Sequence, residues 1–493
     1  MLLRTTSSLL AALALAALPF STAVPFSIGG NSSTASEACG QISSKISDAS
    51  DVIHSLNPDF IPDIHHWYLS SSQVPECVFE PGSADDLATA MEIIASKKSS
   101  FAVESGGHAS IPGFSSTDGV HISLKRMNQV VLSRDNATVE LGFGLTWADV
   151  YEKLDGTGYN VVGGRVVGPG VGGFTLGGGF SWKTNQHGLT CDTVKSFTLV
   201  MPNGTVTRVD SETPDLFFAL KGGLNRFGVV ASAEFYTHPQ PPQVYGGVVI
   251  YGDDHIDAVI DATAQFDADN TDPKAQIITT LRGEPTGVVS LVLFFYDGPE
   301  RPAAFASFDK IDSVISHVKT QSFADFVKGF PANYLPQARG TFHTLSTSKL
   351  TSGFLSAVKN ESDTLRKQMI DHSGFSVSYD IEPFLKTWGD NATESAYPHA
   401  NSPLPLNLDF AWVSPDDDEF WHNAMRASVN HLKQVAQQEG IYSPDDFAAY
   451  PNYAIANTTA VELYGRKNAA RLRSIRSQVD PDGVMDLAGG WSI

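Results

Sequence analysis

The sequence predicts an α+β protein with more than one domain, and three observations support this. From about residue 74, helical and strand-like patterns alternate in short units, whereas longer strand-like runs dominate from residue 241 to about 440. The proline-rich segment 238–242 separates these two regions. A chain of 493 residues also exceeds the size at which a single hydrophobic core is usual.

The first 23 residues have the pattern of a secretory signal peptide. Arg4 precedes an apolar run at residues 9–20, and Ser21-Thr22-Ala23 supplies small residues for cleavage. The run is shorter than the roughly 20 residues of a membrane-spanning helix, and no later segment approaches that length. We therefore expect a secreted, extracellular protein with no membrane partner. Six glycosylation motifs agree with this route, at Asn31, Asn136, Asn203, Asn360, Asn391 and Asn457.

The three cysteines suit an oxidising compartment, in which two of them should pair. Cys39 and Cys77 both lie in the N-terminal segment, where a disulfide would tie the leading arm to the body. Cys191 follows a glycine-rich stretch between apolar runs and is expected to be a buried thiol. With so few thiols and no His-x-x-x-His helix, we expect no metal site.

The formal charge of −21 argues against a nucleic acid or an anionic membrane as partner, because both require clustered Lys and Arg. A neutral or cationic small molecule fits this charge better.

Start signals define two helices in the first domain. Ser83 and Asp86 open a helix whose apolar residues recur at helical spacing up to Ile94, and the strand-like run 101–103 follows. Thr146 and Asp149 open a second, short helix after the run Val139-Glu140-Leu141, and Gly156 and Gly158 close it.

A histidine follows a tight glycine turn at the end of the first of these strands, in Ser105-Gly106-Gly107-His108. Adjacent glycines let backbone N–H groups approach a phosphate-bearing ligand closely, and the histidine offers a ring nitrogen at the same place. A hydrogen-bonded loop histidine is the alternative interpretation of this turn taken alone.

Glycine makes up more than half of residues 163–179, in which Gly168, Gly170 and Gly173 match G-x-G-x-x-G. A dinucleotide-binding Rossmann motif requires a helix that begins at the third glycine. Gly177-Gly178-Gly179 would break its first turns, at about 1 kcal/mol per glycine relative to alanine. We expect instead an extended segment that wraps a large, flat ligand, with a glycine-rich surface loop as the alternative.

The remaining elements follow from shorter patterns. Strands at 194–201 and 205–209 join through Pro202-Asn203-Gly204, a helix spans 214–221, a strand spans 227–235, and the first domain should end near residue 240. The later strand-like runs are 246–251, 287–296, 375–379 and 406–412, and helices are expected near 323–330, 420–439 and 462–479.

Five motifs in this order resemble those of secreted fungal-type, berberine-bridge-enzyme-like members of the vanillyl-alcohol-oxidase/PCMH flavoprotein superfamily. They are Ser-Gly-Gly-His at 105–108, the glycine cluster at 170–179, His-Gly-Leu-Thr-Cys-Asp at 187–192, Lys-Gly-Gly-Leu-Asn-Arg-Phe-Gly-Val-Val at 221–230 and Tyr-Pro-Asn-Tyr at 450–453. The resemblance runs from about Cys39 to the C-terminus.

The resemblance implies a PCMH-type FAD-binding domain of two subdomains, with an inserted substrate domain of antiparallel sheet backed by helices. The boundaries expected for this chain are a signal peptide at 1–23, an N-terminal arm at 24–72, the FAD-binding domain at 73–240, the substrate domain at 241–440 and a C-terminal segment at 441–493 that completes the FAD domain.

The same resemblance implies the cofactor contacts. His108 would bond covalently to the 8α-methyl carbon of the flavin, and the position of a second, cysteinyl link falls at about Val166, so that only the histidyl link is possible. Asn452 and Tyr453 would reach the isoalloxazine. The further residues expected to bind the cofactor are Ser105, Gly106, Gly107, Gly172, Gly173, Gly177 and Val229.

The chemistry implied is oxidation of a substrate C–H bond by FAD, assisted by a base that takes a proton from a hydroxyl or amine. Tyr450 matches a tyrosine with this role in several relatives, and its pKa of about 10 would have to be lowered by a nearby positive group. A packing tyrosine is the alternative. Further candidates are Tyr379 and Glu382, and also His343, His399 and Asp409, each with a structural role as the alternative.

We therefore expect a secreted FAD-dependent oxidase that acts on a small alcohol, phenolic or alkaloid-like substrate and passes electrons to molecular oxygen. Oligosaccharides remain open as substrates, although carbohydrate-oxidising relatives usually carry the double flavin link. A flavin-bearing cyclase of secondary metabolism is also compatible with the sequence, and so is a secreted binding glycoprotein on a degenerate flavoprotein scaffold.

Overall fold

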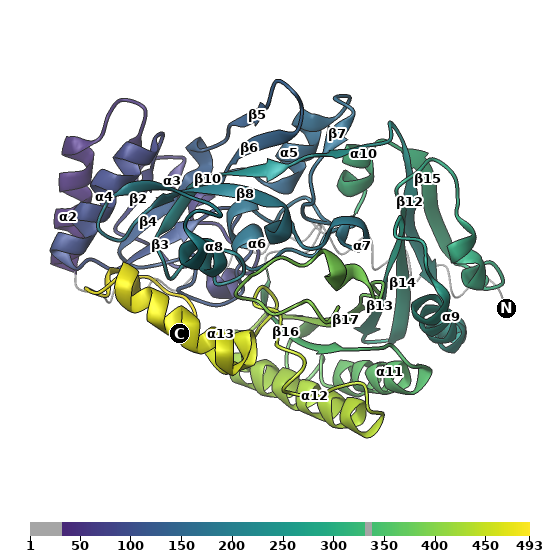
Figure 1. Cartoon of the computed structure of the whole chain (residues 1–493). Coiled ribbons are helices and arrows are strands. Elements are labelled where there is room, and N and C mark those ends of the chain that lie inside the picture. Colours follow the sequence, from purple (N-terminus) through teal and green to yellow (C-terminus); the bar gives the residue numbers. More distant parts are fainter. Residues whose placement is uncertain (1–31, 331–337) are drawn as a thin grey trace.

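A computed structural model describes residues 32–330 and 338–493, and the predicted signal peptide and Asn31 lie outside these ranges. Two smaller sheets built from the first half of the chain lie on one side of the molecule, and a seven-stranded sheet lies on the other (Figure 1). Short 3-10 helices join the main elements: η2 (Leu69–Ser71), η3 (Leu124–Arg126), η4 (Thr190–Thr193), η5 (Asp253–His255), η6 (Ala303–Phe308), η8 (Trp388–Asn391), η9 (Pro415–Asp417) and η10 (Val484–Leu487).

The first sheet has the order β1-β2-β4-β3, with β2, β4 and β3 parallel and β1 antiparallel to β2. Its strands are β1 (Asp51–Ile53), β2 (Cys77–Glu80), β3 (Phe101–Glu104) and β4 (Val120–Ser123), accompanied by α2 (Ser32–Lys45), α3 (Phe60–Asp63) and α4 (Ala84–Lys97). The helix α4 begins as predicted, since the Ser83 hydroxyl accepts a hydrogen bond from the Asp86 N–H. The expected disulfide joins Cys39 of α2 to Cys77 of β2, and Cys191 is a buried free thiol.

The second sheet is antiparallel in the order β5-β6-β10-β8-β9. Its strands are β5 (Val130–Leu132), β6 (Thr138–Gly142), β8 (Val194–Val200), β9 (Val206–Val209) and β10 (Val229–Tyr236). Thr146 and Asp149 form the predicted capping box of α5 (Trp147–Leu154). The helix α8 (Pro214–Leu220) also lies where the sequence predicts it, and β7 (Tyr159–Asn160) pairs with β11 (His238–Pro239).

The glycine-rich segment differs from the prediction, because it contains a short helix, α6 (Val171–Leu176). The predicted extended segment is wrong here because the helix ends at Gly177, before the glycines that would break it. Gly178 and Gly179 have φ values of +120° and +95°, which no longer suit a helix. A further turn, α7 (Thr184–His187), follows.

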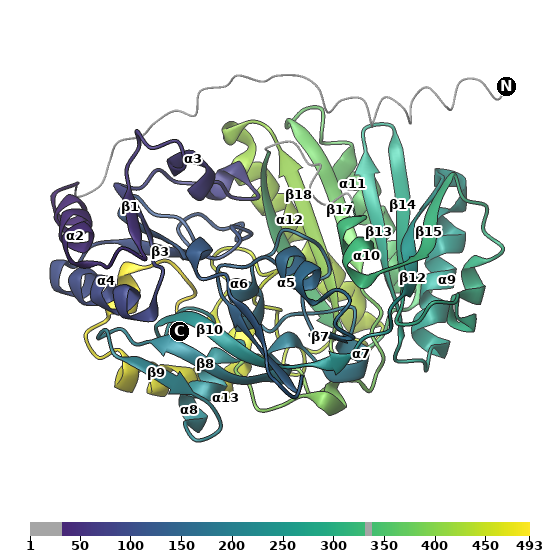
Figure 2. The same ribbon diagram turned by 90° about the horizontal axis from the view of Figure 1, so that it is seen from above.

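The seven-stranded sheet is antiparallel throughout, in the order β15-β12-β14-β13-β17-β18-β16. Its strands are β12 (Val244–Tyr251), β13 (Ala275–Glu284), β14 (Gly287–Tyr296), β15 (Ile315–Gln321), β16 (Arg339–Thr347), β17 (Gly374–Ile381) and β18 (Leu404–Trp412). Three helices back one face, as Figure 2 shows from above: α9 (Ile256–Asp269), α11 (Ser352–Arg366) and α12 (Asp418–Gln438).

The helix α10 (Phe323–Lys328) packs against the seven-stranded sheet, with Phe326 5.1 Å from Phe295 of β14, and it also lies at the junction with the first half of the molecule. Phe323 contacts Tyr151 of α5 with ring centroids 4.9 Å apart, and Phe326 contacts Trp182 at 5.4 Å. These aromatic side chains draw the helix toward the glycine-rich half.

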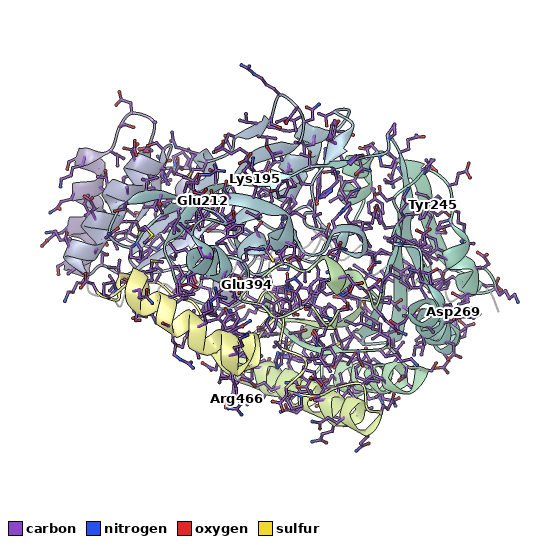
Figure 3. The ribbon with its side chains drawn as sticks, in the orientation of Figure 1. Lys195, Glu212, Tyr245, Asp269, Glu394 and Arg466 are labelled. Carbon is purple, nitrogen blue, oxygen red and sulfur yellow. A yellow bond between two sulfur atoms is a disulfide. The ribbon has the colours of Figure 1, made fainter. Side chains whose placement is uncertain are left out.

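The C-terminal segment returns to the first half of the molecule. The helix α13 (Ala460–Val479) changes direction at Gly465, and its Arg471 donates hydrogen bonds to Asp215 of α8 and to Glu394, which is labelled in Figure 3. Beyond α13, Ala488 forms a parallel bridge with Phe101 of β3. None of the described helices is long and apolar enough to span a membrane.

Candidate functional site

The turn at Ser105–His108 packs tightly against the start of α6. A Cβ on Gly106 would lie 2.3 Å from the backbone nitrogen of Gly170, and Gly107 has a φ of +64°. The Ser105 hydroxyl donates to the Phe143 carbonyl (2.5 Å) and accepts from the Gly172 N–H (3.1 Å). Glycine is therefore required at both positions of the turn, by close approach at Gly106 and by a left-handed backbone at Gly107.

The turn also presents free backbone donors. Among the described residues, no acceptor binds the N–H groups of Gly106, Gly107, His108 and Ala109. Successive N–H groups around a left-handed residue form a concave site that favours an anion. This geometry suits the pyrophosphate of a dinucleotide.

The His108 ring lies between an aromatic ring and a glycine. Trp67 stacks on it with centroids 4.9 Å apart and planes inclined by 19°, and the Trp67 backbone N–H donates to the Gly107 carbonyl (2.9 Å). A Cβ on Gly168 would lie only 2.3 Å from Nε2 of His108. Burial, with a smaller contribution from His66, lowers the pKa of His108 to about 4, so the ring is neutral at ordinary pH.

The other glycines predicted to line the cofactor lie along α6. Gly172 is the second residue of the helix, and a Cβ on Gly173 would meet no atom of the described residues within 4 Å. A Cβ on Gly177 would lie 1.9 Å from the Asn452 side-chain oxygen, so Gly177 and Asn452 are in direct contact. Val229 is buried at the start of β10.

A buried polar trio joins three distant parts of the chain: Arg165, Glu382 and Tyr453. Arg165 donates to both Glu382 oxygens (2.8 Å each) and to the Tyr453 hydroxyl (2.7 Å), which itself donates to Glu382 (3.1 Å). Burial raises the pKa of Glu382, and the Arg165 charge opposes that rise. The trio can therefore accept, hold and pass on a proton.

Tyr450 is not suited to the role of base that the sequence predicts. Its hydroxyl oxygen is buried and accepts hydrogen bonds from the Gly179 N–H and the Asn452 amide (2.9 Å each). Burial raises the pKa of Tyr450 and also that of Tyr453, so the hydrogen-bond partners and not the pKa distinguish the two tyrosines. The tyrosine three residues later, Tyr453, is half-buried and bonds to Arg165 and Glu382.

Three further candidates lie away from the trio. Tyr379 and His343 point to the helix-backed face of the seven-stranded sheet, where Tyr379 bonds to Ser428 of α12 (2.8 Å). His399 is buried, with Nε2 hydrogen-bonded to the Asp192 carboxylate (2.8 Å) and Nδ1 to the Tyr397 carbonyl (2.8 Å). We assign structural roles to all three. Tyr379 and His343 lie under the helices of the sheet, and His399 is held by Asp192 and the Tyr397 carbonyl.

Asp409 faces the same side of the sheet as Glu382. Strand alternation places Asp409 opposite Ser378, two residues from Asp380 and four from Glu382 along the same face. Its carboxylate accepts a short hydrogen bond from the Tyr68 hydroxyl.

Three residues of the site region were not predicted from the sequence: Arg165, Trp67 and Tyr68. Arg165 is the one charged residue within the glycine-rich segment 163–179, and that contrast could have drawn attention to it. Trp67 and Tyr68 are adjacent aromatic residues in the segment assigned to an arm, and no local pattern indicates that they reach the site.

Comparison with known proteins adds to this geometry. Residues 75–210 match the family model described as an FAD binding domain. The chain is 30% identical over 439 residues to an uncharacterized FAD-linked oxidoreductase of Arthroderma benhamiae, covering 85% of this chain and 87% of that protein. It is 29% identical over 450 residues to an FAD-dependent monooxygenase of Cochliobolus heterostrophus, covering 86% and 85% of the two chains.

The fold resembles that of a glucooligosaccharide oxidase from Acremonium strictum, with a TM-score of 0.75 and 20% identity, covering 91% of this chain and 97% of that one. That protein is described as carrying a 6-S-cysteinyl, 8α-N1-histidyl FAD.

Proposed function

This chain belongs to the family of FAD-linked oxidoreductases with a PCMH-type, berberine-bridge-like fold, and from that premise we propose that it is a secreted oxidase of small molecules. The proposed substrates are alcohols, phenolics or alkaloid-like compounds. The substrate loses two electrons and two protons, and molecular oxygen takes up both to form hydrogen peroxide.

The residues of the glycine turn fit the cofactor of this family. Among the described residues, the four N–H groups of Gly106–Ala109 are free and suit the FAD pyrophosphate, and the space beside Gly173 of α6 is open. His108 has no hydrogen-bond partner for either ring nitrogen among residues 32–330 and 338–493. Since the Gly168 backbone covers Nε2, we assign Nδ1 as the nitrogen that bonds to the flavin.

A single covalent link is proposed, in contrast to the doubly linked oxidase from Acremonium strictum. Val166 occupies the position expected for a second, cysteinyl link, and the one free cysteine, Cys191, is buried behind Gly178, to whose carbonyl its backbone N–H donates.

Bound FAD supplies the two-electron acceptor for the reaction. In the proposed mechanism, the Tyr453 hydroxyl takes the proton of the substrate hydroxyl or amine and passes its own proton to Glu382 Oε1. The 3.1 Å hydrogen bond between these two groups supports this relay, and it is the observation that carries the proposal. Arg165 holds both groups in place and balances the carboxylate charge before the proton arrives.

Oxidation of an oligosaccharide is a second candidate. The polar face of the seven-stranded sheet, with Asp380, Asn407 and Asp409, offers acceptors for sugar hydroxyl groups. The absence of a cysteine at position 166 disfavours it, because carbohydrate-oxidising relatives usually have two links.

The proposed secretion rests on the leader pattern, on the Cys39–Cys77 disulfide and on the glycosylation motifs. Asn203, Asn360, Asn391 and Asn457 are exposed in the structure, so glycans could be attached there without disturbing the core.

The test of the cofactor link is acid precipitation of the purified yellow protein. We expect the pellet of the natural protein to stay yellow, whereas His108→Ala should release its flavin into the supernatant. His317→Ala, at an exposed histidine of β15, is the matched control and should keep a yellow pellet. A colourless natural pellet would overturn the covalent link.

The test of the activity is peroxide release under air with a panel of alcohols, phenolics, amines and oligosaccharides. We expect peroxide from at least one small alcohol, phenolic or amine. Bleaching of the flavin under nitrogen without peroxide under air would contradict the oxidase and favour a dehydrogenase.

A further inference from the structure

The sheet face beside the trio carries two carboxylates, those of Asp380 and Asp409. Asp380 accepts hydrogen bonds from Thr280 (2.7 Å), Asn407 (3.2 Å) and Ser378 (3.3 Å), and Asp409 accepts one from Tyr68. All four donors are uncharged. In the part of the chain that the structure describes, neither carboxylate has an ion-pair partner within 4.0 Å.

The nearest cations are already engaged elsewhere. Arg165 makes a bidentate pair with Glu382, and Arg282, which lies opposite Ser378, pairs with Glu284 (2.9 Å). Burial raises the pKa of Asp409 to about 7 and also raises that of Asp380. Two half-buried carboxylates on one face are costly unless a positive group compensates them.

Asn407 provides an independent sign that a donor is missing. Its side chain is 7% exposed and its amide nitrogen donates to Asp380, so the side chain belongs to this cluster. Its side-chain oxygen has no donor among the described residues. A buried acceptor of this kind normally has a partner, so the cluster lacks a donor at the Asn407 side-chain oxygen.

Aromatic rings border the same cluster. Tyr68 lies 5.4 Å from Phe342, which is opposite Asp409 across the strands, and Phe342 lies 6.5 Å from Tyr453 (centroid to centroid). Gly340 makes room for Tyr68, since a Cβ there would lie 2.1 Å from its ring. Carboxylates next to aromatic faces form the surroundings that an organic cation prefers.

We propose that Asp380, Asn407 and Asp409 form a recognition site for a protonated amine, so that the substrate is a small aromatic or aliphatic amine of the alkaloid-like class. This inference rests on the proposed function, whose oxidising site it shares. The ammonium group supplies the N–H donors and the positive charge that the cluster lacks. The proton that leaves the amine before oxidation then passes to Tyr453 and Glu382 on the same sheet face.

The test compares two probes of equal size, 2-phenylethylamine and 2-phenylethanol, on the flavin-loaded protein. Binding is followed by the perturbation of the flavin absorption spectrum under nitrogen, and turnover by peroxide release under air. The variants are Asp409→Asn and Asp380→Asn, which keep the shape of the side chain and remove its charge. Asp371→Asn, at an exposed carboxylate remote from the cluster, is the matched control.

We expect the natural protein to bind the amine at least tenfold more tightly than the alcohol. Each of the two variants should weaken amine binding about tenfold or more and change alcohol binding less than twofold, while Asp371→Asn changes neither. Flavin content and circular dichroism establish that each variant is folded, and Asp380→Asn provides the test if Asp409→Asn does not fold.

Two results would overturn the inference: binding of the alcohol at least as tight as that of the amine, or an equal loss for both probes in the variants. Peroxide formed from neutral alcohols alone would overturn the amine site and leave the oxidase proposal standing. Selective amine binding with no peroxide from any substrate would overturn the oxidase proposal and leave the amine site standing.

Discussion

The two faces of the seven-stranded sheet are built from the same strands and have opposite character. On the helix-backed face, Leu406, Leu408 and Phe410 of β18 pack in an apolar core under α11 and α12. On the other face, Asn407 and Asp409 of the same strand join Asp380, Glu382 and Arg165. Side chains alternate between the two faces along a strand, so neighbouring residues of one strand lie in the core and in the candidate site.

The comparison shows that a titratable side chain is informative only once its face is known. Tyr379 and His343 lie on the same strands as residues of the candidate site, yet they contact the helix layer. Glu382 lies just beyond the end of β17 and reaches Tyr453. Three predictions test whether the two faces are as distinct as the structure indicates.

The largest effect is expected on the polar face, for Tyr453→Phe. Removing the proton-accepting hydroxyl should lower kcat by about 10²–10⁴-fold, the range typical of general acid–base catalysis. Steady-state peroxide release measures it, and the flavin spectrum should be retained. Tyr379→Phe, on the helix-backed face, should leave kcat unchanged and cost about 0.5–1.5 kcal/mol of stability for one lost hydrogen bond. Equal losses of kcat in both variants would contradict the assignment of the faces.

The second effect concerns folding and falls on the helix-backed face. Leu408 is fully buried, so Leu408→Ala should lower the free energy of unfolding by about 2–5 kcal/mol. Urea denaturation followed by tryptophan fluorescence measures this loss. Its neighbour on the polar face provides the control, because Asp409→Asn fills the same volume and should cost much less. A stable Leu408→Ala protein would show that this face is not the core.

The smallest effect is a pH dependence of stability, with opposite signs on the two faces. Burial raises the pKa of Asp409 from 3.8 to about 7, so its contribution to stability is present below about pH 4 and is lost as the pH rises to about 7. Burial lowers the pKa of His343 from 6.5 to about 3, so its contribution is present above pH 6.5 and is lost as the pH falls toward 3.

The measurement is the urea midpoint of each variant relative to the natural protein across this range. Asp409→Asn should gain relative stability between about pH 4 and 7, whereas His343→Gln should gain it as the pH falls below about 6.5. A relative stability that does not change with pH in either variant would show that the corresponding group is not buried as the structure indicates.

Much of the fold could be predicted from local patterns in the sequence. The caps at Ser83 and Thr146 located two helices, and the alternation of Leu, Asn and Asp at 406–410 located β18. The strands β13 and β16 were not predicted, since their mixed composition has no clear alternation.

The candidate site was predicted only in part, because its residues meet through tertiary contacts. His108, Glu382 and Tyr453 were identified, but the roles of Tyr450 and Tyr453 depend on which hydroxyl reaches Glu382. That depends on the position of Arg165, 288 residues from Tyr453 in the chain. No local spacing encodes a contact between segments so far apart.

The bridge between Ala488 and Phe101 has a consequence for the order in which the molecule is assembled. The strand that ends in the His108 turn forms one edge of its sheet, and the last residues of the chain cover that edge. During synthesis from the N-terminus this edge stays unpaired until translation is almost complete. Tyr453 arrives equally late, so a nascent chain can present the glycine turn long before it can enclose a cofactor.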